Sequence, residues 1–246
     1  MALSNCHLLV TGANGFIGKN LVVHLGELEN VTVSTFVRGD EVSRLPDLLA
    51  KVDAVIHLAG ENRPADEASF TQVNLGLTAA LCDAIEQEFA STARHVPLVF
   101  TSSAQAEQDN PYGRSKLAAE QRVLALAQAT GNPCVVFRLP GVFGKWCRPN
   151  YNSVVATFCH NLARDLPIQI NNPDASVRLV YVDDVVNALL NALETPSLGY
   201  TQAAVGPVYT ITLGELAALI RAFAYCRSTL MSERVGTGLI RALYAT

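Results

Sequence analysis

The sequence predicts an α/β fold built on a doubly wound parallel sheet with helices on both faces. Short apolar runs that are typical of buried strands alternate with longer amphipathic stretches along most of the 246 residues. Half of the residues are hydrophobic, which is enough to bury a sizeable core. The first apolar run leads directly into a glycine-rich turn and then into a helical pattern.

The first strand, expected over residues 7–11, precedes a turn that suits a dinucleotide pyrophosphate. Gly12 permits a tight bend, Gly15 lets the backbone approach phosphates, and Gly18 allows strand and helix to pack closely. A helical pattern near 15–28 places unpaired N–H groups and a partial positive charge at the turn. An ordinary tight strand-to-helix connection is the alternative. We therefore expect a Rossmann-like sheet that binds a dinucleotide.

The remaining elements follow in alternation. Further strands are expected at 31–37, 53–59, 96–101, 133–138 and 177–182, and helices at 67–91, 111–130, 151–164 and 184–193. The connection from Gly39 to Lys51 has room for only one or two helical turns. Near the C-terminus, a short strand at 208–211 precedes Thr212-Leu213-Gly214-Glu215, which has the form of a capping box and predicts a helix start.

Composition and charge exclude several function classes. The net charge of −4, without a long basic or acidic block, argues against nucleic-acid and membrane partners. No apolar segment approaches the ~20 residues of a membrane-spanning helix. The six cysteines form no C-x-x-C pair, so we expect neither a metal site nor a disulfide framework. These features predict a cytoplasmic protein with reduced thiols.

The spacing of Tyr112 and Lys116 indicates a pair with an acid–base role. Their i, i+4 spacing places both on one face of the expected helix. A phenol with a pKa of about 10 is a poor acid near neutral pH, and a nearby ammonium lowers that pKa. The Lys116 ammonium can also hydrogen-bond a cofactor ribose. A chance pair on a helix surface is the alternative interpretation.

Hydroxyl groups at the end of the strand expected at 96–101 are a further signal. Thr101-Ser102-Ser103 stands at its carboxyl end, and ligands of open α/β sheets bind outside the carboxyl ends of the strands. A hydroxyl at that edge can polarise a substrate carbonyl. A serine-rich strand end that caps the next loop is the alternative.

The glycine turn, the strand-end serines and the Y-x-x-x-K spacing resemble the extended branch of the short-chain dehydrogenase/reductase superfamily, the NAD-dependent epimerase/dehydratase group. Asn74 stands where that branch has a helix asparagine. Its third strand, its R-x-x-N-V-Y-G segment and its Y-V-x-D-V segment are matched by residues 53–60, 138–144 and 181–185. The resemblance implies that Ser103, Tyr112 and Lys116 are the catalytic residues.

Arg38 bears on the choice of cofactor. NAD enzymes place an acidic side chain on the ribose about 20 residues beyond the glycine turn. Here the expected strand ends at Arg38, whose guanidinium suits a 2′-phosphate and favours NADPH. NADH remains possible if Asp40 or Glu41 reaches the ribose. With the resemblance, the expected cofactor-binding residues are Gly12, Asn14, Gly15, Phe16, Ile17, Gly18, Arg38, Leu58, Ala59, Gly60, Asn74, Lys116, Leu139 and Pro140.

The stretch 143–153 is expected to face the substrate. It holds the single Trp and several polar donors, of which Lys145, Arg148, Asn150 and Asn152 suit a nucleotide sugar. A packed crossover in which Asn152 or Ser153 caps the next helix is the alternative. With the resemblance, the expected substrate-binding residues are Ser103, Arg138, Lys145, Arg148 and Asn152.

Three longer segments point to one family within this branch. Residues 109–121, 143–170 and 209–220 resemble the reductase domains of bacterial capsular-polysaccharide bifunctional enzymes of UDP-N-acetyl-L-fucosamine synthesis. That family implies NADPH-dependent reduction at C4 of a UDP-2-acetamido-2,6-dideoxy-4-hexulose, which gives an L-talose type sugar. It also implies a UDP-sugar substrate and a metal-binding cupin domain beyond the last residue, and the wider superfamily implies a homodimer. The metal-dependent activity of such a cupin is expected to be absent from this chain.

The expected organisation has two parts. Residues 1–225 form the NAD(P)-binding domain, with substrate-binding insertions near 142–175 and 205–225 that make a small C-terminal subdomain. Residues 226–246 form a helical tail that leads to the missing cupin. Gly141 replaces the asparagine of the family segment, and Val177 stands where an arginine often contacts the pyrophosphate. Arg178, one step along the strand, faces the other side.

Two other functions remain open. A nucleotide-sugar epimerase would keep NAD tightly bound through its cycle. A dehydratase usually adds acidic residues beside the catalytic serine, and Ala104-Gln105-Ala106 supplies none. A non-catalytic NADP-binding sensor on the same fold often lacks the Tyr or the Lys, and both are present here.

Overall fold

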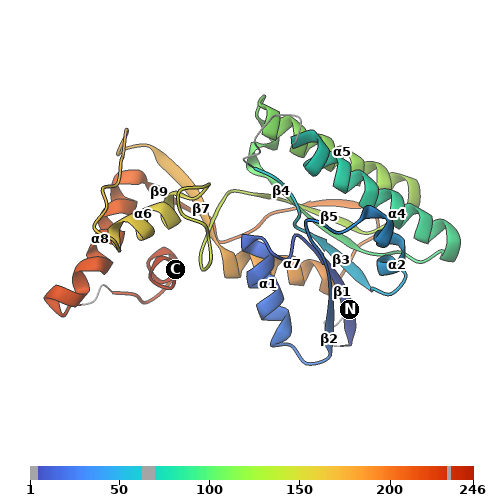
Figure 1. The fold of residues 1–246 in the computed structure, drawn as a ribbon, viewed down its shortest axis with the longest axis horizontal. Coiled ribbons are helices and arrows are strands. Elements are labelled where there is room, and N and C mark those ends of the chain that lie inside the picture. The colour runs from blue at the N-terminus through green and yellow to red at the C-terminus, as the bar shows by residue number, and fades with distance from the viewer. Residues whose placement is uncertain (1–4, 63–69, 232–233) are drawn as a thin grey trace. The chain divides into compact units, whose positions relative to one another are not determined.

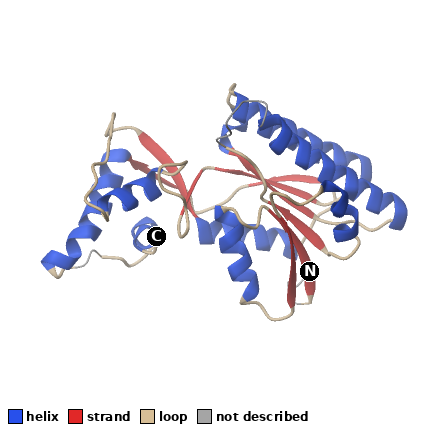
Figure 2. Cartoon of the chain, viewed as in Figure 1, coloured by secondary structure: helices blue, strands red, loops and turns tan. Residues whose placement is uncertain are grey.

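The computed structural model describes residues 5–62, 70–231 and 234–246 (Figures 1 and 2). The chain forms two compact units. The first comprises Met1–Leu139 and Val186–Val205, and the second comprises Pro140–Val185 and Gly206–Thr246. No helix of the described residues has both the length and the apolarity that crossing a bilayer requires.

The first unit is built on a six-stranded parallel sheet with the order β2-β1-β3-β4-β5-β8. The doubly wound α/β class predicted from the sequence is thereby confirmed. Strand-to-helix alternation along the chain forces parallel pairing, because each helix returns the chain to the same edge of the sheet. The strands are β1 (Cys6–Thr11), β2 (Val31–Phe36), β3 (Ala54–His57), β4 (Leu98–Ser103), β5 (Cys134–Leu139) and β8 (Tyr200–Ala203).

Helices cover both faces of this sheet (Figure 1). One face carries α1 (Phe16–Gly26) and, from Val186 onward, α7 (Val182–Glu194). The other face carries α2 (Leu45–Leu49), α4 (Leu77–Thr92) and α5 (Pro111–Thr130). Shorter helical turns are η1 (Val42–Arg44), the π-helical η2 (Thr71–Gly76) and η3 (Ala104–Glu107).

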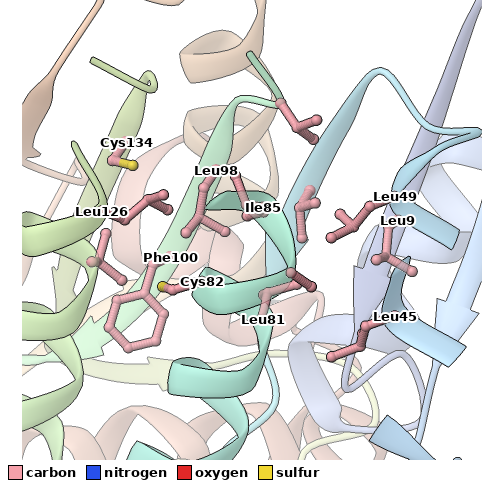
Figure 3. Close-up of a cluster of buried hydrophobic side chains, with 14 of the residues drawn as sticks. Leu9, Leu45, Leu49, Leu81, Cys82, Ile85, Leu98, Phe100, Leu126 and Cys134 are labelled. Atoms are coloured by element: carbon pink, nitrogen blue, oxygen red, sulfur yellow. The ribbon is translucent and has the colours of Figure 1, made fainter. Parts of the chain in front are cut away.

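The core between the sheet and α2, α4 and α5 follows from strand alternation. Leu9, Leu98 and Phe100 point to one face at period two and are at most 1% exposed. They pack in one buried cluster with Leu81 and Ile85 of α4 (Figure 3). Burial of such side chains contributes roughly 2 kcal/mol each, so this cluster holds the carboxyl end of β4 in place.

The second unit has its own sheet and core. Strand β7 (Ser176–Tyr181) pairs parallel with β6 (Gly141–Phe143) and antiparallel with β9 (Tyr209–Thr212). Its helices are α6 (Val154–Leu162), α8 (Leu213–Thr229) and α9 (Gly238–Tyr244). Phe143, Leu216 and Leu243 meet in a separate buried cluster, so the last helix packs within this unit. The domain boundaries expected at 225 and 226 stay a prediction.

Three strands differ from the sequence expectation. One of them, β6, is a short strand that the pattern did not indicate. The strand expected at 177–182 forms β7, but it pairs in the second sheet and not in the parallel one. The sixth parallel strand is β8, which the pattern did not indicate because Thr201 and Gln202 are exposed. The first residues of the helix expected at 67–91 lie outside the described residues, and the described part ends at Thr92.

Candidate functional site

The strand order places a ligand crevice beside the glycine turn. The chain passes from β1 to β2 on one side and returns to β3 on the other, and ligands bind at the carboxyl ends where the order reverses. Gly12 has a φ of +70°, and a Cβ at this position would lie 2.7 Å from the Ala59 nitrogen. A Cβ at Gly18 would lie 2.3 Å from the Gly12 oxygen. Only glycine fits at either position.

Helix α1 presents its N-terminus to this turn. Its N-cap residue, Gly15, offers no side chain to bond the first N–H groups, and the first turn contains no acidic residue. These N–H groups and the positive end of the helix dipole are therefore available to an anion. The cradle that a Cβ would fill, together with this helix end, fits the pyrophosphate of a dinucleotide.

Asn74 joins three parts of the first unit through its amide. Its amide oxygen accepts a hydrogen bond from the backbone N–H of Glu61 at 2.8 Å. Its amide nitrogen donates to the backbone oxygen of Glu61 at 3.0 Å and to Ser115 Oγ at 2.9 Å. A Cβ at Gly60 would lie 3.1 Å from the Asn74 amide oxygen and 3.3 Å from Lys116 Nζ. The expected cofactor residues Gly60, Asn74 and Lys116 therefore lie together.

The structure brings Ser103 and Tyr112 together. Asn110 caps α5 by accepting from the Gly113 nitrogen at 2.8 Å, and Pro111 occupies the first turn, so the helix starts where Tyr112 faces the strand end. Burial raises the pKa of Tyr112, and a side-chain hydrogen bond with Ser103 opposes that shift. Desolvation thus outweighs the hydrogen bond, so the pKa of Tyr112 is raised and not lowered as the sequence led us to expect, and the phenol stays protonated near neutral pH.

Lys116 is buried one helical turn further along. Its Nζ donates to the Thr101 oxygen at 3.0 Å and lies 5.0 Å from the centre of the Phe100 ring. Burial lowers the pKa of Lys116 to about 8, and the carboxylate of Glu120 opposes this shift. Lys116 is therefore a buried cation close to its titration point at physiological pH.

The two strand-end serines have different partners. Ser103 Oγ accepts from the Gln105 nitrogen at 3.1 Å and faces Tyr112. Ser102 Oγ donates instead to the carboxylate of Glu120, which is 4% exposed. Only Ser103 has its hydroxyl beside the phenol.

Arg138, expected to bind substrate, is held in ion pairs. Its Nε and Nη2 donate to Glu120 at 2.7 to 3.1 Å, and its Nη1 donates to Glu107 at 2.6 Å. Its guanidinium is therefore anchored to α5 and η3. Sequence reasoning did not single out Glu120, although its place four residues after Lys116 puts both on one face of α5.

His57 was also missed, and it links the glycine turn to Asn74. Thr78 Oγ1 donates to the Asn74 backbone oxygen at 2.6 Å, so it accepts from His57 Nε2 at 2.9 Å. His57 Nδ1 then accepts from the Thr11 hydroxyl at 2.6 Å. Burial, followed by the Lys116 charge, lowers the pKa of His57 to about 3, so the ring is neutral. The sequence did contain a signal for His57, because it is a histidine in an otherwise apolar strand.

Arg38 lies at the end of β2 in an ion pair. Its side chain is 86% exposed, and its Nη2 lies 2.6 Å from Glu61 Oε2. The pair is exposed on the Arg38 side, and surface ion pairs contribute at most about 1 kcal/mol. Asp40, the alternative ribose ligand, accepts from the Val37 nitrogen at 2.8 Å and pairs with Arg44. Its carboxylate is thus already bound within its own loop.

The other expected cofactor residues occupy the ends of the same elements. Leu58 and Ala59 are half-buried after β3, and Leu139 is buried at the end of β5. In and after the glycine turn, Asn14 is exposed, and Phe16 and Ile17 are half-buried. Pro140 is the first residue of the second unit.

The expected substrate stretch lies in the second unit. Lys145 Nζ is 3.6 Å from Asp183 Oδ2, and the Arg148 guanidinium is 5.3 Å from the Tyr151 ring. Asn152 is exposed, and Ser153 is the residue that caps α6, with its Oγ accepting from the Ala156 nitrogen at 3.3 Å. The capping alternative therefore holds for Ser153, and the side chains before it point to other partners or to solvent.

The glycine turn at the point where the strand order reverses, together with the N-terminus of α1, is the arrangement of a dinucleotide-binding α/β protein. The chain belongs to the NAD dependent epimerase/dehydratase family, whose sequence profile matches residues 8–206. The family implies a nicotinamide dinucleotide as cofactor, and the glycine cradle fits one.

Individual relatives are similar over nearly the whole chain. The chain is 50% identical over 239 residues to UDP-2-acetamido-2,6-beta-L-arabino-hexul-4-ose reductase of Pseudomonas aeruginosa, a match that covers 97% of the chain and 63% of the relative. Capsular polysaccharide assembling protein CapF from Staphylococcus aureus has a TM-score of 0.81 at 34% identity, over 98% of this chain and 63% of that one. The chain thus spans less than two thirds of either relative.

A more distant structure supports the fold alone. The Bordetella bronchiseptica enzyme WbmF, solved in complex with NAD+, has a TM-score of 0.82 at 19% identity and covers 100% of this chain and 92% of that one. Its similarity extends over both units.

Proposed function

We propose that the chain is an NADPH-dependent reductase of the C4 ketone of a UDP-2-acetamido-2,6-dideoxy-4-hexulose. The product would be a UDP-2-acetamido-2,6-dideoxy-L-talose type sugar for capsular polysaccharide or O-antigen precursors. The observation that carries the proposal is the buried Tyr112 phenol, hydrogen-bonded to Ser103 and placed one helical turn before Lys116. The 50% identity to a hexulose reductase supports the substrate class.

Each residue of the set has a distinct task. Tyr112, protonated because it is buried, gives its proton to the oxygen of the ketone as that oxygen gains charge. Ser103 holds the same oxygen with its hydroxyl. Lys116, whose Nζ donates to the Thr101 backbone oxygen, keeps a positive charge beneath the site. It would also bind the cofactor ribose. A reduced nicotinamide, when bound, supplies the hydride for the carbonyl carbon.

The protein would hold the cofactor with residues of the first unit. Gly12, Gly15 and the N-terminus of α1 would bind the pyrophosphate, and Asn74 would order the loop after β3. Arg38 would bind the 2′-phosphate and release Glu61. Lys145, Arg148 and Asn152 of the second unit are proposed contacts for the sugar nucleotide. The cytoplasmic location and the homodimer stay predictions.

The direct test follows NADPH absorbance with a 4-keto UDP-HexNAc sugar. We expect stoichiometric oxidation by the natural protein, and Tyr112→Phe should lose at least about 100-fold in kcat, since it lacks the proton donor. NADPH affinity of this variant should stay unchanged. Tyr225→Phe, at an exposed position on α8, is the matched control. Undiminished reduction by Tyr112→Phe would exclude the assignment.

The same measurement separates the alternatives. Copurified NAD with no net oxidation would favour an epimerase, and NADPH binding without turnover would favour a sensor. Cofactor preference is tested by the Kd values of NADPH and NADH. Arg38→Ala should weaken NADPH binding about tenfold or more and leave NADH binding unchanged. Arg44→Ala, another exposed arginine in an ion pair, is the control.

A further inference from the structure

We propose that Glu120, together with Arg138, is a positioning pair that fixes the serine strand end against the Tyr-Lys helix and keeps Lys116 charged. The inference rests on the proposed function for its kinetic consequences. It reassigns Arg138 from contact with substrate to contact with Glu120. The evidence for the pair is the set of hydrogen bonds and ion pairs that the buried Glu120 carboxylate makes.

Glu120 is the point where three elements meet. It belongs to α5, the helix of Tyr112 and Lys116, and it is 4% exposed. It accepts a hydrogen bond from the hydroxyl of Ser102 on β4, the residue next to Ser103. It also accepts hydrogen bonds from two nitrogens of Arg138 on β5, and Nη2 lies 2.7 Å from Oε2. The carboxylate therefore sets the distance between the strand end and the helix.

Arg138 makes this junction rigid. A guanidinium is planar and presents its N–H groups in a fixed fork, so two nitrogens on one carboxylate fix its orientation as well as its distance. Arg138 also donates to Glu107 of η3, the turn that directly follows Ser103, at 2.6 Å. The strand end is thus held before and after Ser103, by Ser102 and by η3.

Glu120 also acts on Lys116 through its charge. Among the described residues, the Lys116 ammonium lies over the Phe100 ring and donates to the Thr101 carbonyl, and neither group carries a charge. His57, which faces it from β3, is neutral, and Tyr112 on its own helix is protonated. Glu120 is therefore the negative charge that opposes the burial of the ammonium.

The test uses Glu120→Gln in the full chain, which removes the charge but keeps a side chain of the same shape. The Lys116 titration is followed by NMR on 13C-labelled lysine and is assigned by its loss in Lys116→Met. We expect the midpoint to fall by about half a pH unit or more. The alkaline limb of kcat should move by the same amount, and kcat should fall more than KM changes. Glu86→Gln, in another Glu–Arg pair that involves α5, should move neither.

The sign of the shift decides the result. Loosening of the structure would hydrate Lys116 and raise its midpoint, whereas loss of the Glu120 charge lowers it. A raised or unchanged midpoint would therefore overturn the inference. If Glu120→Gln does not fold, Glu120→Gln/Arg138→Met leaves neither charge of the pair unpartnered and should also lower the Lys116 midpoint, because the Glu120 carboxylate is again absent. A lowered midpoint in a protein without reductase activity would sustain the electrostatic role and reject the proposed function instead.

Discussion

At the scale of single residues, the burial of Lys116 makes the stability of the fold depend on pH. Its pKa is about 8 in the fold and 10.5 as the ordinary value, so the folded state favours the neutral amine. Between these values the unfolded chain binds more protons than the folded one, and stability rises with pH through this window. Below pH 8 both states are protonated, and the full cost of the buried charge remains.

Lys116→Met lacks the buried charge, so its stability relative to the natural protein should be greater at neutral pH than at alkaline pH. We expect the free energy of unfolding of the natural protein to rise, relative to Lys116→Met, by about 2 kcal/mol or more between pH 7 and pH 10. Urea unfolding of both proteins at the two pH values measures this, and subtraction cancels the titrations they share. A difference that does not change with pH would show that Lys116 does not titrate in this window.

The glycine turn offers a second test at this scale. Gly12→Ala puts a Cβ 2.7 Å from the Ala59 nitrogen at a φ of +70°, so we expect a loss of more than about 1 kcal/mol and weaker NADPH binding. Gly26→Ala is the matched control, because no atom lies within 4 Å of its Cβ and α1 is already helical there. It should stabilise the protein by roughly 0.5 kcal/mol and leave the Kd unchanged. Equal effects of the two changes would contradict the close approach at Gly12.

At the scale of elements, α8 depends on its first turn. Thr212 Oγ1 accepts from the Glu215 nitrogen at 3.2 Å, and Glu215 Oε2 accepts from the Thr212 nitrogen at 3.0 Å. Thr212→Ala should cost about 1 kcal/mol in urea unfolding, whereas Thr212→Ser keeps the cap and should cost little. Hydrogen bonds from the Thr212 backbone N–H and from its hydroxyl lower the pKa of Glu215. Thr212→Ala removes only the bond from the hydroxyl, so the difference between the two variants should shrink as acidification protonates Glu215. A constant difference down to low pH would argue against the hydroxyl–carboxylate bond.

The elements also indicate how far the sequence could predict the fold. The capping box, the glycine turn and the helix over 111–130 are local patterns, and the structure contains each of them. The partner of a strand is not a local property. The pattern at 177–182 predicts a strand whether it joins the parallel sheet or pairs with β6 and β9. Strand β8 was missed because an edge strand needs little apolar alternation.

The candidate site divides in the same way. The i, i+4 spacing of Tyr112 and Lys116 and the strand-end position of Ser103 could be predicted, since each depends on one element. The ion pairs of Arg138 could not be predicted, because its partners lie 18 and 31 residues away, on α5 and η3. The direction of the Tyr112 pKa shift also depends on burial, which only the packed structure reveals.

At the scale of the whole molecule, the two units hold separate cores. Ile85 lies in the cluster of the first unit and Leu216 in that of the second, and both are 0% exposed. The chain passes between the units after residues 139, 185 and 205. A unit with its own core can open on its own, so stability need not be uniform along the chain.

Hydrogen exchange can therefore distinguish one cooperative unit from two. Leu216→Ala and Ile85→Ala should each cost about 2–5 kcal/mol, because each leaves a cavity in a close-packed cluster. We expect Leu216→Ala to lower amide protection in 140–185 and 206–246, and Ile85→Ala to lower it in the first unit. Saturating NADPH should raise protection in the first unit of both variants, since the proposed cofactor residues other than Pro140 lie there. If each substitution lowers protection equally throughout the chain, the units unfold together, and the separate clusters do not define separate cooperative units.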